Sequence, residues 1–299
     1  DAFTAHDILR RAVSALHDAI GRGVPSVTYS MSSKVYDTRD DTLMQEFAAA
    51  LRTEGGLYLV YQPKMCLQTG APIGLEALIR WRHPVHGELS PVAFVPLAEQ
   101  TELLEAMTRW VIDRAIGRLA RLRAHCIQLP ITVNVSLNDF ARESFAALLE
   151  EQMQQHRLPT SLLGIECLET ERIIESPQAM AGLVRLKQRG FDIALDDFGT
   201  GYSNISYLRR MPLDVIKLDR SLISDLSSDM ASRIIARSII SMLKELDYVV
   251  LAEGVENAET VHTLTEYGCD QAQGFFYARP MTDADLDTWL LWKLRELCR

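Results

Sequence analysis

The chain has 299 residues, of which 47% are hydrophobic and 24% charged, and its formal net charge at pH 7 is −9. This acidic balance argues against duplex nucleic acid as the main partner, because such binding normally depends on a basic surface, and an anionic substrate would need metal ions. Five scattered cysteines and the lack of a run of roughly 20 apolar residues argue against a disulfide framework and against membrane contact, so we expect a cytoplasmic location.

The first forty residues differ in pattern from the rest of the chain. Residues 5–22 carry apolar side chains at helical spacing, which predicts one amphipathic helix. A mostly polar stretch without strong periodicity follows over residues 26–41. We therefore divide the chain into residues 1–40 and a main domain of residues 41–299. Because the chain begins at Asp1 without an initiating methionine, we expect a fragment of a longer protein whose sensory or membrane parts lie upstream.

In the main domain, β-rich apolar runs alternate with helical patterns. About eight such repeats predict an α/β fold, either a closed barrel or a doubly wound sheet. Acidic residues at many strand ends, rather than at one switch point, favour the barrel. We expect strands near residues 57–62, 72–79, 130–135, 163–167, 192–196, 214–218, 248–252 and 270–276, and helices near 43–51, 91–122, 139–156, 177–189, 204–210, 222–246, 256–267 and 282–296.

Acidic or amide side chains stand where several of the strand-like runs stop. An ionised carboxylate near the end of a buried strand is costly unless it is paired or holds a metal, so its repetition suggests a shared site. Oxygen donors without thiolates or matched histidines favour Mg²⁺ or Mn²⁺ over zinc. The residues in these positions are Glu76, Asn134, Glu166, Asp196, Asp197, Lys217 and Glu253.

The adjacent Asp196 and Asp197 are the centre of this predicted site. A two-metal hydrolytic site needs two cations about 4 Å apart, a bridging carboxylate and outer ligands for each ion. Neighbouring residues of a strand point to opposite faces, so both aspartates reach one site only if the strand ends there and the chain turns. The sequence of residues 198–201 supplies glycines for that turn. Taken alone, an Asp-Asp pair before a glycine loop is more often a solvated turn.

Two further charged residues belong to the predicted site. Lys217 stands beside apolar residues, where an ammonium is costly unless carboxylates surround it. It can orient or deprotonate a water, contact a phosphate, or form a structural salt bridge under the barrel rim. Glu169 follows Glu166 by three residues, and we expect it to support the loop rather than bind the metal.

The residues around Glu76 carry a resemblance to a known family. Glu76-Ala77-Leu78, followed by Ile-Arg-Trp-Arg-His-Pro, resembles the signature of the EAL family of cyclic di-GMP phosphodiesterases. The match covers about residues 40–299, and residues 9–16 are similar to the closing helix of a GGDEF-type cyclase domain. The other motifs, in the family's order and spacing, are residues 61–63, 134–136, 166–169, 196–203, 217–219, 253–256 and 273–275.

The resemblance implies a modified (β/α)8, TIM-like barrel with one antiparallel strand, which hydrolyses cyclic di-GMP to linear pGpG with two Mg²⁺ or Mn²⁺ ions. The loop of residues 198–203 resembles a mobile loop that couples metal binding to dimerisation in the family, so a homodimer is possible. The resemblance assigns the first metal to Glu76, Asn134, Glu166 and Asp196, and the second to Asp196, Asp197 and Glu253. It assigns assistance of the attacking water to Lys217 and support of the loop to Glu169. The substrate contacts that it implies are Gln62, Glu76, Leu78, Arg80, Asn134, Asp219, Gln273 and Pro280.

One position departs from the family pattern. Leu168 replaces the threonine that usually precedes Glu169, and the lost hydroxyl is expected to loosen the loop without removing a metal ligand. Two other functions remain open at this point. A cyclic di-GMP receptor would bind the nucleotide without cleaving it, and an enolase-like barrel would use a lysine base and Mg²⁺ to remove a proton from a carboxylic acid.

Overall fold

The structure is a computed structural model of residues 1–299. It describes residues 33–53, 55–99, 101–168, 173, 175–199, 208–227 and 229–297. The helix expected over residues 5–22, Glu169 and most of the 198–203 loop lie outside the described residues.

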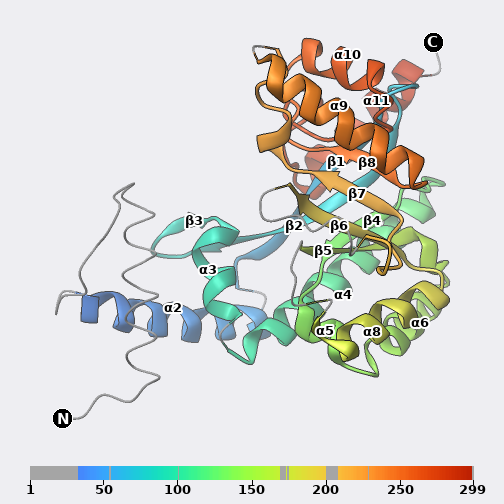
Figure 1. The fold of residues 1–299 in the computed structure, drawn as a ribbon. Helices are drawn as coiled ribbons and strands as arrows, with labels where there is room; N and C mark the ends of the chain where they lie inside the picture. The colour runs from blue at the N-terminus through green and yellow to red at the C-terminus, as the bar shows by residue number, and fades with distance from the viewer. Residues whose placement is uncertain are drawn as a thin grey trace.

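The strands form one sheet that closes into a barrel (Figure 1). The order is β1-β9-β8-β7-β6-β5-β4-β2-β3, and an additional β1–β2 pairing closes the ring. β1 is antiparallel to both of its barrel neighbours, whereas the pairs from β2–β4 round to β8–β9 are parallel. The predicted fold class, a (β/α)8-type barrel with one antiparallel strand, is therefore confirmed. The strands are β1 (Leu57–Cys66), β2 (Pro72–His83), β3 (Gly87–Leu89), β4 (Ile131–Asn134), β5 (Leu163–Leu168), β6 (Asp192–Phe198), β7 (Val215–Leu218), β8 (Val249–Ala252) and β9 (Gln271–Ala272).

Helices cover the outside of the barrel in two groups (Figure 1), with α9, α10 and α11 on one side and α4, α5, α6 and α8 on the other. α4 shows why they pack there, since Met107, Val111, Ala115 and Leu119 recur every fourth residue and are buried. The strands beneath, such as β5 and β6, are buried along most of their length because both of their faces are covered. The helices are α2 (Ser33–Thr53), α3 (Pro91–Ala98), α4 (Leu103–Ala124), α5 (Leu137–Ala141), α6 (Phe145–Gln155), α8 (Pro177–Gln188), α9 (Met230–Glu245), α10 (Ala258–Glu266) and α11 (Asp283–Leu297), with short 3₁₀ turns η1 (Thr160–Leu162) and η3 (Arg220–Leu222).

The short helix α5 fixes the chain just after β4. Ser136 and Asp139 form a reciprocal capping box at its start, which satisfies backbone N–H groups that the first turn leaves free. α5 packs against α8 at Gly182, where a Cβ would lie 1.9 Å from the carbonyl oxygen of Phe140. Only glycine permits this approach, which holds the end of β4 in place.

Several predicted element bounds are wrong. The helix expected over residues 91–122 is two helices, because the Thr101 hydroxyl caps the end of α3 by donating to Ala98 and accepts from the N–H of Leu103 to begin α4. The helix expected over 139–156 divides into α5 and α6, and the helix expected from 222 begins at Met230, where the Asp229 side chain caps it. The strand expected over 270–276 is only two residues long.

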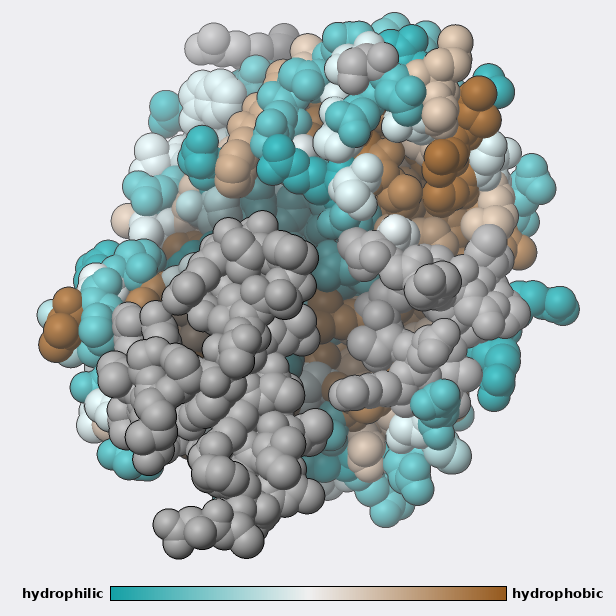
Figure 2. Space-filling view, turned by 60° about the vertical axis from the view of Figure 1, so that its left-hand side comes forward, coloured by the Kyte–Doolittle hydropathy of each residue, from teal (hydrophilic) through white to brown (hydrophobic). Residues whose placement is uncertain are grey.

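The polar stretch that precedes residue 41 is helical from Ser33 onward, within the described residues. Its many polar and charged side chains hid the helix from a periodicity argument. Residue 40 therefore lies within α2, and the division of the chain at this residue stays a prediction. Among the helices of the described residues, none combines the length and apolar character that a membrane span requires. The face in Figure 2 carries mostly hydrophilic side chains on its described surface, with hydrophobic ones in patches.

Candidate metal and substrate site

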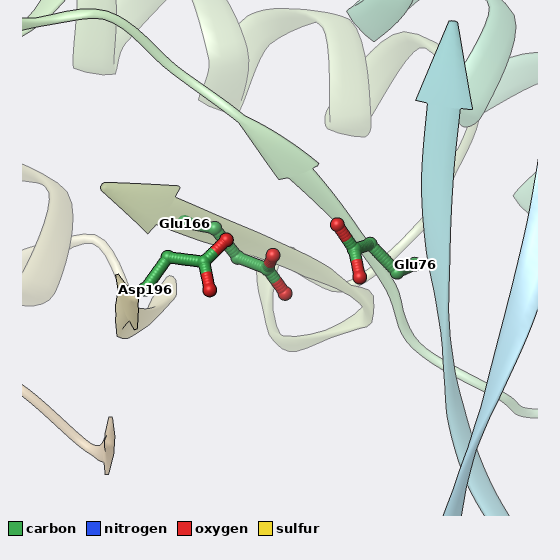
Figure 3. A group of neighbouring side chains, drawn as sticks. All are labelled: Glu76, Glu166 and Asp196. Carbon is green, nitrogen blue, oxygen red and sulfur yellow. The ribbon is translucent and has the colours of Figure 1, made fainter. Parts of the chain in front are cut away.

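Carboxylates from different strands meet at one end of the barrel. Glu76 lies in β2 opposite Thr132 of β4, Glu166 lies near the end of β5, and Asp196 lies in β6. Their side chains point toward one another (Figure 3). One oxygen from each of the three lies within 4.8 Å of the others, and Asp196, Asp197 and Glu253 form a second such group. Asp196 belongs to both groups, so these residues can hold metal ions on either side of it.

The backbone of β6 explains how two adjacent aspartates reach one site. The sequence predicts that the strand ends at this pair, but β6 continues to Phe198. Asp197 instead adopts a left-handed conformation with φ of 56°, and the register with β7 shifts between Leu195 and Phe198. This conformation is uncommon for a residue other than glycine and costs on the order of 1–3 kcal/mol. The kink replaces the alternation of an ordinary strand, and it puts both carboxylates on one side.

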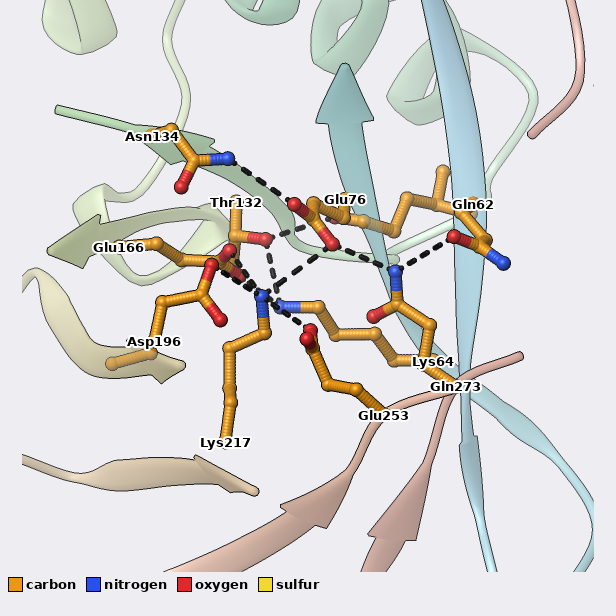
Figure 4. Close-up of polar contacts among 12 residues, drawn as sticks. Gln62, Lys64, Glu76, Thr132, Asn134, Glu166, Asp196, Lys217, Glu253 and Gln273 are labelled. Atoms are coloured by element: carbon orange, nitrogen blue, oxygen red, sulfur yellow. Dashed lines mark hydrogen bonds and ion pairs between the residues drawn. The ribbon is translucent and has the colours of Figure 1, made fainter. Parts of the chain in front are cut away.

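The Lys217 ammonium lies at the centre of the cluster (Figure 4). Its Nζ is 2.7 Å from Glu166 Oε2, 2.7 Å from Glu253 Oε1 and 3.0 Å from Asp196 Oδ2, and its side chain is fully buried. A longer contact of 3.5 Å joins it to Glu76. Burial alone would lower the pKa of this lysine, but the surrounding carboxylates raise that pKa well above its ordinary value. The carboxylates therefore favour the protonated, cationic form of Lys217.

Glu166 is held by a second lysine that the sequence did not indicate. Lys64 of β1 donates to Glu166 Oε1, while Lys217 donates to Oε2. Lys64 also donates to the Thr132 hydroxyl at 2.7 Å. Burial opposes ionisation of Glu166, but the two ammonium groups outweigh it and hold the pKa of that carboxyl below its ordinary value.

Three other carboxyl groups of the cluster have the opposite behaviour, because their pKa values are raised. Burial raises the pKa of Glu253 to about 8, although Lys217 acts against the rise. Burial also raises the pKa values of Glu76 and Asp196, and the negative charge of Glu166 raises both further. Lysines alone therefore do not supply enough positive charge to keep every carboxyl ionised at neutral pH.

Amide side chains complete the polar network around Glu76 (Figure 4). Asn134 Nδ2 donates to Glu76 Oε1 at 3.1 Å, and Gln273 Nε2 donates to Oε2 at 2.7 Å. Gln273 also donates to Gln62 Oε1 at 3.1 Å, and its own Oε1 is buried without a partner among the described residues. This free acceptor is available to an N–H or O–H group of a ligand.

A cavity of about 230 Å³ opens over the carboxylates. It brings together Gln62, Glu76, Leu78, Asp196, Glu253 and Gln273 of the predicted residues. Its lining also contains Arg220, Glu256 and Phe275, to which the sequence analysis assigned no role. Of these, Arg220 and Glu256 form an ion pair of 3.0 Å at the rim.

Other predicted substrate residues lie away from this lining. Arg80 does not line the cavity and donates to the Ile79 carbonyl oxygen at 2.8 Å. Asp219 caps η3 by accepting from the N–H of Ser221. Pro280 lies next to Met281, which pairs with Tyr61 of β1. The roles of these residues, and that of Glu169 outside the described range, stay predictions.

The fold and site define a TIM-like α/β barrel with an oxygen-rich, acidic site at one end of its strands. Comparison with known families identifies the group within this class. The EAL domain family matches residues 44–280, and the chain belongs to this family.

Curated relatives and a solved structure resemble the chain over most of its length. The chain is 40% identical over 284 residues to cyclic di-GMP phosphodiesterase PA2567 of Pseudomonas aeruginosa, and this match covers 95% of this chain and 48% of that protein. It is 33% identical to cyclic di-GMP phosphodiesterase PdeR of Escherichia coli, over 94% of this chain and 42% of that protein. The chain thus spans about half the length of these curated relatives. Among solved structures, the PaMucR phosphodiesterase in complex with c-di-GMP matches with a TM-score of 0.76 at 35% identity, covering 82% of this chain and 99% of that one.

Proposed function

We propose that this chain hydrolyses cyclic di-GMP to linear pGpG in a reaction that depends on divalent metal ions. The observation that carries the proposal is the pair of carboxylate groups that share Asp196, each with its oxygens within 4.8 Å of one another. The EAL family membership and the names of the similar proteins supply the substrate. A cyclic dinucleotide is an anion, and an acidic site needs added cations to receive it.

The side chains present fit hard cations. The donors are carboxylate and amide oxygens without sulfur, which suits Mg²⁺ or Mn²⁺, and the raised pKa values of Glu76, Asp196 and Glu253 indicate a shortage of positive charge. Two such ions, when bound, supply charge neutralisation and activate water for attack on phosphorus. Glu76, Asn134, Glu166 and Asp196 would hold one ion, and Asp196, Asp197 and Glu253 the other.

The remaining residues act on the substrate and on protons. Lys217 contacts carboxylates of both groups and so fixes their relative positions, and it is proposed to assist the attacking water, as the resemblance implies. Gln273 Oε1 accepts a hydrogen bond from the bound nucleotide, and Gln62 and Leu78 line the same cavity. Arg80, Asp219 and Pro280 are proposed to contact substrate at the edge of the site, with Arg80 directed to a phosphate oxygen. A homodimer also belongs to this proposal, through the loop that follows Asp197.

The test is incubation of purified protein with cyclic di-GMP and Mg²⁺ or Mn²⁺, followed by chromatographic separation of the products. We expect pGpG with either metal, and no product with a chelator. The Asp196→Asn variant is the matched control, because it removes charge from the shared ligand with little change of volume. Tight nucleotide binding by the wild-type protein without turnover would favour a receptor, and the absence of both would overturn the proposal.

A further inference from the structure

Lys64 has an unusual place for a lysine. Only 5% of its surface is exposed, although it lies on a barrel strand between apolar residues. Its ammonium makes two side-chain contacts, with Glu166 Oε1 and with the Thr132 hydroxyl. The Thr132 hydroxyl in turn donates to the Leu75 carbonyl oxygen at 3.4 Å, which ties this pair to β2. Burial of an ammonium group is energetically unfavourable unless it is paired, so the function of Lys64 is sought in its contact with Glu166.

The two lysines of the site divide their contacts differently. Lys217 is shared among four carboxylates, whereas Glu166 is the one carboxylate that Lys64 contacts among the described residues. Figure 4 shows the two ammonium groups meeting the Glu166 carboxylate. Lys64 therefore holds Glu166 Oε1 through a contact that it shares with no other carboxylate of the cluster.

Lys64 reaches Glu166 from the opposite end of the barrel. It lines a second cavity, of about 420 Å³, together with residues at the beginnings of several barrel strands, among them Gly164, Asp192 and Val215. It does not line the cavity over the carboxylates, which Glu76, Asp196 and Glu253 do line. Lys64 therefore leaves the ligand side of the cluster open while fixing one member of the cluster from beneath.

We propose that Lys64 is a positioning residue that fixes the Glu166 carboxylate for metal binding. This inference rests on the proposed function, because Glu166 is assigned to a metal there. With Oε1 tied to Lys64, the carboxylate presents Oε2 to the site in one orientation. Partners of this kind orient ligands, and their loss typically costs about 10–100-fold in metal affinity or activity.

The test compares Lys64→Met with Lys64→Arg, which keeps a cation and has the 420 Å³ cavity beside it for its larger head group. Loss of the Lys64 cation strengthens metal binding, while loss of the Glu166 orientation weakens it, so the metal affinity alone does not test the inference. We expect Lys64→Met to lower kcat by about tenfold or more at saturating Mn²⁺, with KM within about twofold. The Mn²⁺ electron paramagnetic resonance spectrum of Lys64→Met should differ from the wild-type spectrum. Lys64→Arg should restore kcat and KM to within about threefold of wild type, and its spectrum should have the wild-type line shape.

Lys187→Met is the matched control, since Lys187 forms an ion pair with Asp214 outside the carboxylate cluster. It should leave kcat and the spectrum unchanged. In a Glu166→Ala background, Lys64→Met should cause no further spectral change, because Lys64 acts through Glu166. If Lys64→Met fails to fold, Lys64→Gln takes its place in the comparison with Lys64→Arg.

A folded Lys64 variant without a cation, with wild-type kcat and spectrum, overturns the inference, as does an equal spectral change in the Glu166→Ala background. If the wild-type protein binds Mn²⁺ but leaves cyclic di-GMP intact, the proposed function is wrong. The spectra then still decide the role of Lys64. Wild-type protein that binds no Mn²⁺ overturns both.

Discussion

Replacement of Lys217 by methionine tests the electrostatic account of the site directly. The change keeps an unbranched chain of similar length but removes the ammonium that contacts Glu76, Glu166, Asp196 and Glu253. Lys64 remains, but it contacts only Glu166. The variant therefore leaves three buried or half-buried carboxyl groups without their cation.

The expected loss of stability follows from burial. Removal of one partner from a buried ion pair typically costs about 3–5 kcal/mol, because the remaining charge is left uncompensated. Lys217 is fully buried, so solvent does not screen the loss. At about 2–4 °C per kcal/mol for a domain of this size, the metal-free variant should melt roughly 6–20 °C below the metal-free wild type. A divalent cation at the same carboxylates supplies the missing positive charge.

The assay is thermal unfolding of wild type and Lys217→Met, each with a chelator and with saturating Mg²⁺. We expect the metal to raise the Tm of the variant by more than that of the wild type, while turnover of cyclic di-GMP stays lost. Lys187→Met serves again as the control for loss of a lysine ion pair. A metal-free variant as stable as wild type, or an equal rise of Tm in both proteins, would refute the reasoning.

Three further outcomes follow from the same contacts. Burial raises the pKa of Glu253 in the folded protein to about 8 from its ordinary value of 4.5, so the metal-free protein should lose stability as pH rises between these two values. The expected loss in free energy of unfolding is about 1.4 kcal/mol per pH unit for this group. Urea unfolding at several pH values should show this pH dependence without Mg²⁺ and not with it. Glu76→Ala should abolish hydrolysis, and a purified variant that keeps a tenth of wild-type turnover would contradict the assignment of Glu76 to a metal. Leu168→Thr should raise kcat by at most about tenfold, because the new hydroxyl helps to order the loop. Leu168 is 47% exposed, so the change loses little packing. Unchanged kinetics at several Mg²⁺ concentrations would show that the loop does not depend on this hydroxyl.

The closed barrel was predictable because its signal is local and repeated. Each βα unit carries an apolar run that ends in a polar residue, and the parallel strands bring those ends together. Glu76, Glu166, Asp196 and Glu253 were found in this way. Helix bounds were less predictable, since a single Thr101 or Asp229 side chain moves the start of a helix by several residues.

Lys64 and the left-handed Asp197 could not be found from strand ends. Lys64 lies inside β1, whose residues are nearly all buried, so the buried lysine has no periodic pattern around it. Its partner Glu166 is 102 residues away in the chain. The conformation of Asp197 accompanies the register shift between the Leu195 and Phe198 pairings with β7, which only the folded sheet provides. Arg220 and Glu256 received no role for a similar reason, because their ion pair joins η3 to the segment that follows β8.

The positive charge of the site is placed unevenly, and this decides where a cation enters. Glu166 has a lysine on each oxygen, has a lowered pKa and does not line the 230 Å³ cavity. Glu76, Asp196 and Glu253 line that cavity, and their pKa values are raised. The shortage of positive charge therefore faces the cavity, while the surplus lies beneath it. We expect metal ions to arrive from the cavity side and to remain at its floor, where the phosphates of a nucleotide in the same cavity can share them.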